Sequence, residues 1–431
     1  MSHGVGRSGD LLEAQPKAVG STIVGRLACA LARDAAVRGS GLTCVDKGLA
    51  VVLPVCTGMA CSLVLRSLAN ALPPLEGATG PDVVLWSRID QKSCLKSVYA
   101  AGMECAVVPT VRGELPSPSS DAPSGRRRRR TYASDEVRTD LPALRRLLLD
   151  YVGRRRVVAV ISTTSCFAPR IPDDVDEIAR ICEEFAVGHV VNHAYGLQCQ
   201  LATKLVNRAA AVGKVDAIVC STDKNFLTPV GGSVVLCPDA EFAAGVGRTY
   251  PGRASGSPAM DLTMTLLSMG LEGYKGLLAK REKMRESFRK KLNDVAASHG
   301  ERVLDCPNNT ISFGITLGGV EGRILASLNM SSLEIDQRRE ASSVDRTKEV
   351  GLKVSRIGSM LFTRNVSGAR VVPQGLDKII CGHNFRGFGS SNENYPTAYM
   401  TAACAIGMEE TEIDTFVKRL DKVLKDFDKG L

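Results

Sequence analysis

The sequence carries none of the marks of a secreted or membrane-spanning protein. Its 14 cysteines form no Cys-x-x-Cys pair, no signal-peptide pattern opens the chain, and no apolar stretch approaches the length of a membrane span. Regularly spaced cysteine pairs would indicate a disulfide framework or a metal centre, so we predict free thiols, no metal site and no membrane partner. We expect a cytoplasmic protein.

A strong surplus of charge of either sign is also lacking. The 55 Lys and Arg exceed the 46 Asp and Glu by nine, and five of these charges form one run, Arg126–Arg130, which leaves only +4 elsewhere. Such a balance permits a nucleic-acid partner without requiring one. With 431 residues, 44% of them hydrophobic, the chain can bury a large core and form two or three domains.

Short apolar runs alternate with amphipathic stretches, which predicts an α/β fold with a largely parallel sheet. The expected strands are 49–55, 82–86, 104–109, 157–161, 188–192 and 217–220, and the expected helices are 21–37, 59–72, 92–101, 141–152 and 173–185. We predict an amino-terminal segment 1–20, a large domain 21–260 and a smaller α+β domain 261–431 that begins with long helices and ends with an amphipathic helix at 411–427. Two polar stretches, 113–136 and 321–349, read as insertions, the first disordered and rich in arginine.

Lys224 is the first candidate for chemistry. It follows the apolar run 217–220 and precedes a Pro-Val-Gly-Gly turn and a second apolar run, the pattern of a strand, a lysine at its exit, a tight turn and another strand. A partly desolvated lysine at a sheet edge can lose its proton and attack an aldehyde, as enzymes that use pyridoxal 5'-phosphate require. A solvated lysine at a strand end is the alternative.

Two further stretches supply what a pyridoxal ring and its phosphate need. Asn192 ends the strand 188–192 and could pair with the pyridine nitrogen, although Asn also favours turns. Cys56, Thr57 and Gly58 form a turn before a helix, whose free N–H groups and dipole suit a phosphate, although a turn without a ligand has the same pattern.

Longer motifs carry a resemblance. The sequence around Asn192 and Lys224 (Asn-His-Ala-Tyr-Gly and Ser-Thr-Asp-Lys-Asn-Phe), with Tyr-Pro-Gly-Arg-Ala-Ser at 250–255, Arg-Ile-Asp-Gln-Lys-Ser at 88–93 and Phe-Arg-Gly-Phe at 385–388, resembles the O-phosphoseryl-tRNA(Sec) selenium transferase family. The likeness covers nearly the whole chain apart from the two insertions. It implies a fold-type I pyridoxal phosphate enzyme.

The resemblance also implies roles for individual residues. Lys224 would bind the cofactor through its amine, be displaced by the phosphoseryl amine and then remove the α-proton. The substrate's phosphate would be held by Arg7, Ser8, Gln15 and Arg253. Gln91 would approach the cofactor, Lys92 and Ser93 would line the site, and Arg364 would read the discriminator base of the tRNA. His193 stands where the family has a second asparagine, so the contacts beside Asn192 are open.

Family members carry a leader of several helices before the loop that contains Arg7. This chain starts at Met1, directly before that loop, which we interpret as either a short gene model or a reduced form. The resemblance implies a homotetramer. The run Arg126–Arg130, which the family does not generally have, could contact tRNA phosphates, act as a localisation signal or be a solvated loop.

We therefore predict conversion of O-phosphoseryl-tRNA(Sec) to selenocysteinyl-tRNA(Sec), with selenophosphate as the selenium donor. Two alternatives stay open. A pyridoxal phosphate enzyme acting on a free amino acid, such as a desulfurase or selenocysteine lyase, would explain the cofactor motifs but not the phosphate-holding loop or Arg364. A non-catalytic tRNA-binding protein is the other.

Overall fold

The structure is a computed structural model, and it describes residues 11, 18–77, 80–113, 130–328 and 343–430, with the side chains of 343–347 excepted. All 14 cysteines lie in this part and are free thiols, most of them buried. None of the helices described there combines the length and apolar character needed to span a bilayer. No group of three potential metal ligands gathers within the same residues.

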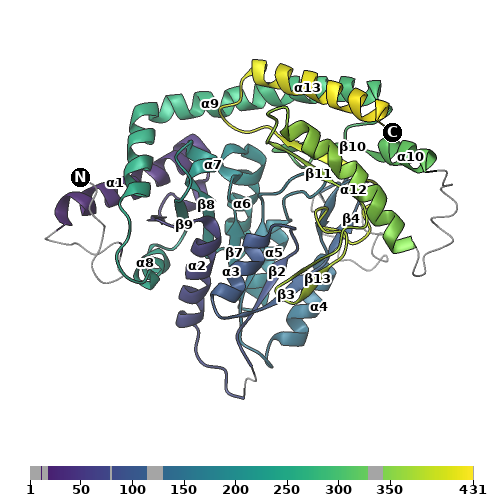
Figure 1. The fold of residues 1–431 in the computed structure, drawn as a ribbon. Helices are drawn as coiled ribbons and strands as arrows, with labels where there is room; N and C mark the ends of the chain where they lie inside the picture. The colour runs from purple at the N-terminus through teal and green to yellow at the C-terminus, as the bar shows by residue number, and fades with distance from the viewer. Residues whose placement is uncertain (1–10, 12–17, 78–79, 114–129, 329–342, 431) are drawn as a thin grey trace.

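Seven strands form the central sheet (Figure 1), and six of them run in one direction. Only β9 is antiparallel to its neighbours β1 and β8. Nearly every residue of these strands is buried, as expected when helices cover both faces of a sheet. In spatial order the strands are β1 (Leu49–Leu53), β9 (Ser233–Cys237), β8 (Ala217–Ser221), β7 (Gly188–Asn192), β6 (Val157–Thr163), β2 (Val83–Ser87) and β3 (Glu104–Val108).

Helices cover both faces because alternate strand residues face opposite sides. In β1, Val51 and Leu53 belong to the core under one layer of helices, and Ala50 and Val52 to the core under the other. The first layer contains α2 (Thr57–Ala71), α3 (Lys92–Ala100) and α8 (Ala240–Thr249). The second contains α1 (Val19–Asp34), the π-helix η2 (Ala35–Gly39), α4 (Leu141–Tyr151), α5 (Val175–Glu184) and α6 (Gln200–Val212).

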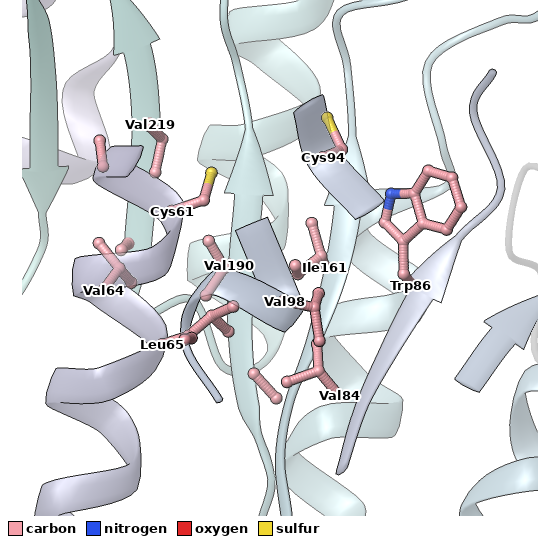
Figure 2. Close-up of a cluster of buried hydrophobic side chains, with 14 of the residues drawn as sticks. Cys61, Val64, Leu65, Val84, Trp86, Cys94, Val98, Ile161, Val190 and Val219 are labelled. Carbon is pink, nitrogen blue, oxygen red and sulfur yellow. The ribbon is translucent and has the colours of Figure 1, made fainter. Parts of the chain in front are cut away.

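Helix α2 crosses the sheet. It follows the edge strand β1, yet it packs against β9, β8, β7 and β6 through a buried stripe that includes Val64 and Leu65. Figure 2 shows these side chains in one cluster with Val98 of α3, Val190 of β7 and Ile161 of β6. The first turn of α2 is therefore carried toward the middle of the sheet.

The carboxy-terminal part is joined to the large sheet by one long helix, α9 (Ser257–Ser298), which bends at Gly270, where φ is +64°. Its first half packs on α1 and η2, and its second half on α13 (Glu410–Lys429). The predicted boundary at 260/261 falls inside this helix. The smaller sheet has the order β10 (Ser312–Thr316), β14 (Tyr399–Ala403), β11 (Ala369–Val372), with α10 (Gly318–Ser327) and α12 (Ser343–Phe362) beside it.

A hairpin of β12 (Lys378–Ile380) and β13 (His383–Phe385) returns from the carboxy-terminal part to the large sheet. Phe385 meets Trp86 of β2 edge-on at 6.1 Å between ring centroids, and Tyr99 of α3 bonds His383 at 2.8 Å. A second small hairpin pairs β4 (Thr110–Arg112) with β5 (Val137–Thr139). The two parts of the chain thus meet along β2 and α3.

Two predicted insertions are smaller than expected. Residues 130–136 were predicted to be disordered, but Arg130 pairs with Asp174 at 3.2 Å, and the fully buried Glu136 accepts the N–H of Asn308. These charges have partners on two other segments, which is why this end is ordered; residues 114–129 lie outside the described part. Residues 321–327 belong to α10, because Val320 and Ile324 are buried in the carboxy-terminal core.

Candidate active site

The strand ends bring the predicted residues to one edge. Strands β1, β2, β7 and β8 run in the same direction, so the segments containing Cys56, Gln91, Asn192 and Lys224 all leave the sheet on the same side. This is the side on which open α/β sheets bind ligands. Contacts between these segments, given below, join them into one site.

Lys224 does not lie in a simple strand–turn–strand hairpin. It lies in a one-turn helix, α7 (Thr222–Phe226), which ends where Leu227 takes a left-handed conformation. Its Nζ lies 3.2 Å from Asp223 Oδ2 and 3.2 Å from Ser221 Oγ, and 46% of its side chain is exposed. We expected partial desolvation, but the amine is half exposed and its charge is balanced by the adjacent carboxylate.

The main chain of Lys224 is also fixed. Its carbonyl accepts a hydrogen bond of 2.9 Å from the buried Gln198 side chain, whose Oε1 accepts the N–H of Ile406 at 2.9 Å. The Gln198 carbonyl in turn accepts from Arg281 of α9, which is 1% exposed and also donates to Cys404. The lysine is therefore anchored to the carboxy-terminal part as well as to its own strand.

Asn192 ends β7 with its side chain buried. Its Nδ2 donates to Cys94 Sγ at 3.0 Å, and its Oδ1 accepts the N–H of Ala194 at 3.2 Å. Burial raises the pKa of the Cys94 thiol to about 11, so the thiol stays neutral beside the amide. One N–H of the Asn192 amide remains available for a ring nitrogen.

The first turn of α2 lies next to the first turn of α3. A Cβ added to Gly58 would lie 3.5 Å from Ser93 Cβ. The first main-chain bond of α2 runs from Ala60 N–H to the Cys56 carbonyl, which leaves the N–H groups of Thr57, Gly58 and Met59 without an acceptor in the helix. These donors and the helix dipole can hold a phosphate, as predicted for Cys56, Thr57 and Gly58.

Tyr195 and Gln91 lie between these elements. The Tyr195 ring is 5% exposed and contacts Phe167 at 5.5 Å between centroids, and its main-chain N–H donates to Ser165 Oγ. Burial raises the pKa of its hydroxyl well above the usual value, and the nearby Gln91 amide offsets part of the rise without completing a well-formed hydrogen bond. Sequence reasoning missed Tyr195, although it belongs to the motif that follows Asn192.

His193 is fully buried, and it is neutral at ordinary pH because burial lowers its pKa to about 3. Its Nδ1 lies 2.7 Å from Thr164 Oγ1, at the end of β6. A Cβ on Gly196 would come within 2.2 Å of the imidazole, so the glycine makes room for the ring. The histidine that departs from the family pattern is thus a neutral ring whose Nδ1 is fixed by Thr164.

Three buried polar atoms at this edge lack a hydrogen-bond partner among the described residues: His193 Nε2, Tyr195 Oη and Asn225 Oδ1. Buried polar groups are nearly always satisfied, so unsatisfied groups gathered after β7 and β8 indicate a polar ligand. Together with the lysine, the Asn192 amide and the free first turn of α2, they fit pyridoxal phosphate.

Lys92 begins α3, beside Ser93, and its exposed amine faces cations from the carboxy-terminal part. The pKa of Lys92 is lowered by Lys378 first, and by Arg370 among the smaller causes. Arg370 lies on β11 and Lys378 on β12. The sequence could not show this convergence, because the three residues are far apart in the chain.

The phosphate site predicted from Arg253, Arg7, Ser8 and Gln15 is only partly described. Arg253 is exposed and has no hydrogen bond or ion pair within the described residues. Leu11 packs near it, lining a hollow with Pro54, Ala254 and Ser255 that does not include Lys224. Arg7, Ser8 and Gln15 lie outside the described residues, so their predicted role in holding a phosphate stays a prediction.

Arg364 lies just after α12, away from the sheet edge. Its Nη2 pairs with Asp426 of α13 at 2.8 Å, and its Nη1 donates to the Met360 carbonyl at 3.0 Å. Only 30% of its side chain is exposed. The arginine is already oriented by protein groups, with its remaining N–H groups available to a base.

Fold and site define the class: this is a fold-type I enzyme that uses pyridoxal phosphate. The profile of the family described as O-phosphoseryl-tRNA(Sec) selenium transferase, SepSecS, matches residues 1–115 and 129–425. The chain belongs to this family, as the resemblance implied.

Individual relatives agree with this assignment. The chain is 39% identical to the O-phosphoseryl-tRNA(Sec) selenium transferase of Dictyostelium discoideum, over 98% of the chain and 80% of the relative. It is 33% identical to that of Methanopyrus kandleri, again over 98% of the chain and 80% of the relative. The crystal structure of archaeal SepSecS superposes with a TM-score of 0.73 at 27% identity, covering 97% of the chain and 79% of that structure. Sphingosine-1-phosphate lyase from Burkholderia pseudomallei, with a TM-score of 0.59 at 14% identity over 96% of the chain and 79% of that structure, shares the fold alone.

Proposed function

We propose that this chain converts O-phosphoseryl-tRNA(Sec) to selenocysteinyl-tRNA(Sec), the last step of selenocysteine biosynthesis. The observation that carries the proposal is the meeting of Lys224, the Asn192 amide and the free first turn of α2 at one sheet edge, in a chain that matches the family over residues 1–115 and 129–425. The alternative of a free amino acid as substrate has no such family support.

The residues divide the work. Pyridoxal phosphate, when bound, supplies the electron sink that lets the α-proton of the phosphoseryl group leave. Lys224 binds the cofactor and takes that proton, with Asp223 and Ser221 keeping the amine in place. Asn192 holds the ring nitrogen, and the first turn of α2 with Gln91 and Ser93 holds the phosphate side of the site.

The neutral environment around Asn192 favours elimination. An amide, unlike a carboxylate, does not keep a ring nitrogen protonated, so it supports a weaker electron sink suited to loss of a β-phosphate. The leaving phosphate needs cations, and we assign Arg7, Ser8, Gln15, Arg253 and Lys92 to it. Arg364 is proposed to read the discriminator base through the N–H groups that Asp426 leaves available.

Three finer points are also proposals. We propose selenophosphate as the donor: its selenium would add to the β-carbon after the phosphate has left, and water would then cleave the Se–P bond and release a second phosphate. We propose that the chain assembles as a homotetramer and works in the cytoplasm; the exposed apolar residues Val19 and Ile23 on α1, with Met264 and Leu267 on α9, support burial against another copy.

The test is reconstitution. The purified chain is incubated with phosphoseryl-tRNA(Sec), pyridoxal phosphate and selenophosphate, and the aminoacyl group is released and identified as selenocysteine. Product with the unmutated chain supports the proposal. Turnover of free cysteine or selenocysteine with none of phosphoseryl-tRNA would favour the lyase or desulfurase alternative, and tRNA binding without turnover would favour a binding protein.

A further inference from the structure

Two cations from separate strands lie over one phenylalanine, and a third cation lies near them. The guanidinium carbon of Arg370 lies 6.0 Å from the centroid of the Phe388 ring, and the amine of Lys378 lies 5.3 Å from the same centroid. Lys92, the first residue of α3, lies near Lys378, whose charge lowers the pKa of the Lys92 amine. A Cβ on Gly389 would lie 3.2 Å from Arg370 Nη2, so this glycine lets the guanidinium approach the loop.

No carboxylate balances these charges. Within the part of the chain that the structure describes, none of the three cations forms an ion pair. The nearby Asp90 is already occupied, since it pairs with Arg88 and accepts the N–H groups of Gly389 and Ser391.

Asp377, the neighbour of Lys378, accepts the N–H of Gly387. Like charges repel, so an arrangement that brings three together without a counter-charge favours a bound anion. The cluster therefore has the charge pattern of an anion site.

The loop that carries Phe388 is held rigidly. Asp90 is 5% exposed, and its Oδ2 accepts from Gly389 N–H at 2.6 Å and from Ser391 N–H at 2.8 Å. The N–H of Asp90 donates to Ser391 Oγ at 3.0 Å. Residues 88–93 and 386–391 thus form one unit, which fixes the loop of Phe388 next to the segment that carries Lys92.

The cluster borders the active site. Lys92 precedes Ser93, which faces Gly58 in the first turn of α2, and Cys94, which bonds Asn192. Arg370 and Lys378 come from the carboxy-terminal part and approach Lys92. An anion held there would lie at the edge of the site.

We propose that Arg370 and Lys378, together with Lys92, form a phosphate-binding subsite at the edge of the active site, with Phe388 beneath the two carboxy-terminal cations. The proposal rests on the function proposed above. It places Arg370 and Lys378 beside Lys92 as two further cations at the edge of the site. The phosphate has two possible sources with the same chemistry: a phosphodiester of the tRNA acceptor end, or the phosphate group of the selenium donor.

The test uses the holoenzyme and the variants Arg370→Gln, Lys378→Gln and the double variant. Lys418→Gln on the exposed face of α13 removes the same charge elsewhere and serves as the control. Two measurements need no turnover: the Kd for tRNA(Sec) as a function of salt, and the Kd for inorganic phosphate. The KM for selenophosphate is added where the unmutated enzyme turns over. Failure of the proposed reaction is thus separated from failure of the subsite.

If the subsite holds a tRNA phosphodiester, the double variant weakens tRNA binding about tenfold, and the slope of log Kd against log salt falls by roughly 0.7. If it holds the donor's phosphate, the Kd for inorganic phosphate and the KM for selenophosphate rise about tenfold while tRNA binding is unchanged. Lys378→Arg, which keeps the charge, should show little of either loss. Values equal to those of Lys418→Gln in every measurement, with an unchanged cofactor spectrum, would overturn the proposal.

Discussion

Lys224 and Lys92 both lie in the first turn of a helix at the same edge of the sheet, yet their surroundings are opposite. Lys224 has a carboxylate 3.2 Å away and neutral groups around it, whereas Lys92 faces Lys378 and Arg370 without a counter-charge. An amine whose charge is paired with a carboxylate can lose its proton and form a bond to carbon. A cluster of cations without a counter-charge favours a bound anion. The difference matches the roles proposed for them, covalent attachment of the cofactor for Lys224 and phosphate binding for Lys92.

The largest effect should come from Lys224→Ala. Removing the amine abolishes the covalent attachment of pyridoxal phosphate, and we expect turnover to fall roughly 10³-fold or more. Lys92→Ala, the matched change on the other side, should keep the attachment while lowering turnover. Borohydride reduction followed by peptide mapping measures attachment directly. Labelling of the Lys224→Ala chain at another lysine would show that Lys224 is not the lysine that binds the cofactor.

The next largest effect should come from Asp90→Asn. The change leaves the Arg88 guanidinium, 5% exposed, without its charge partner and weakens the anchor of the Phe388 loop. Breaking a buried pair in this way costs about 3 kcal/mol or more. We expect a clear fall in the urea midpoint together with weaker phosphate binding. Asp82→Asn, which breaks the more exposed pair with Arg156, is the comparison and should cost less.

A smaller effect is expected from His193→Asn, and it depends on pH. The pKa of about 3 in the folded protein lies below the usual value of 6.5, so below pH 6.5 the unfolded chain takes up a proton that the folded chain does not. The stability contributed by the neutral ring is fully present above pH 6.5 and is lost as the pH falls toward 3. At pH 5 the loss amounts to about 2 kcal/mol.

Urea unfolding at pH 7 and pH 5 checks this expectation. The unmutated chain should lose about 2 kcal/mol more than His193→Asn over that interval. Parallel curves for the two proteins would mean that another group, such as the buried His189, whose pKa is lowered to about 4, carries the dependence. Acid sensitivity of the large domain should therefore arise from these two buried, neutral imidazoles.

The smallest effect should come from Asp426→Asn. Arg364 and Asp426 are each about one-third exposed, so the loss of their ion pair should change stability by at most about 1 kcal/mol. Arg364 would lose its orientation, and discrimination between discriminator bases should weaken by about fivefold at most. Ratios of kcat/KM for two tRNA variants measure it. Unchanged ratios in both Asp426→Asn and Arg364→Ala would remove Arg364 from recognition.

Much of the large domain was predictable because its strands are short buried runs followed by polar residues. The strand 188–192 was predicted with its exact limits, and 217–220 within one residue, so Asn192 and Lys224 could be placed at one edge. The fold class is confirmed, and the family implied by the motifs is confirmed. The roles of the individual site residues remain predictions.

What the sequence did not show depends on contacts between distant segments. A five-residue helix such as α7 has no periodicity to detect, so Lys224 was expected in a hairpin. The order of 130–136 depends on partners at 174 and 308, and the convergence of Arg370 and Lys378 on Lys92 depends on the return of the β12–β13 hairpin. Local patterns carry no information about such partners.

The hydrogen bonds around Gln198 connect Lys224 to the carboxy-terminal part of the chain. Gln198 links the Lys224 carbonyl to Ile406, and through Arg281 to the long helix α9. A rocking of the carboxy-terminal part over the sheet would therefore pull on the backbone that carries the reactive amine within two hydrogen bonds. A large substrate that displaces the carboxy-terminal part would therefore displace the Lys224 amine as well, without touching it.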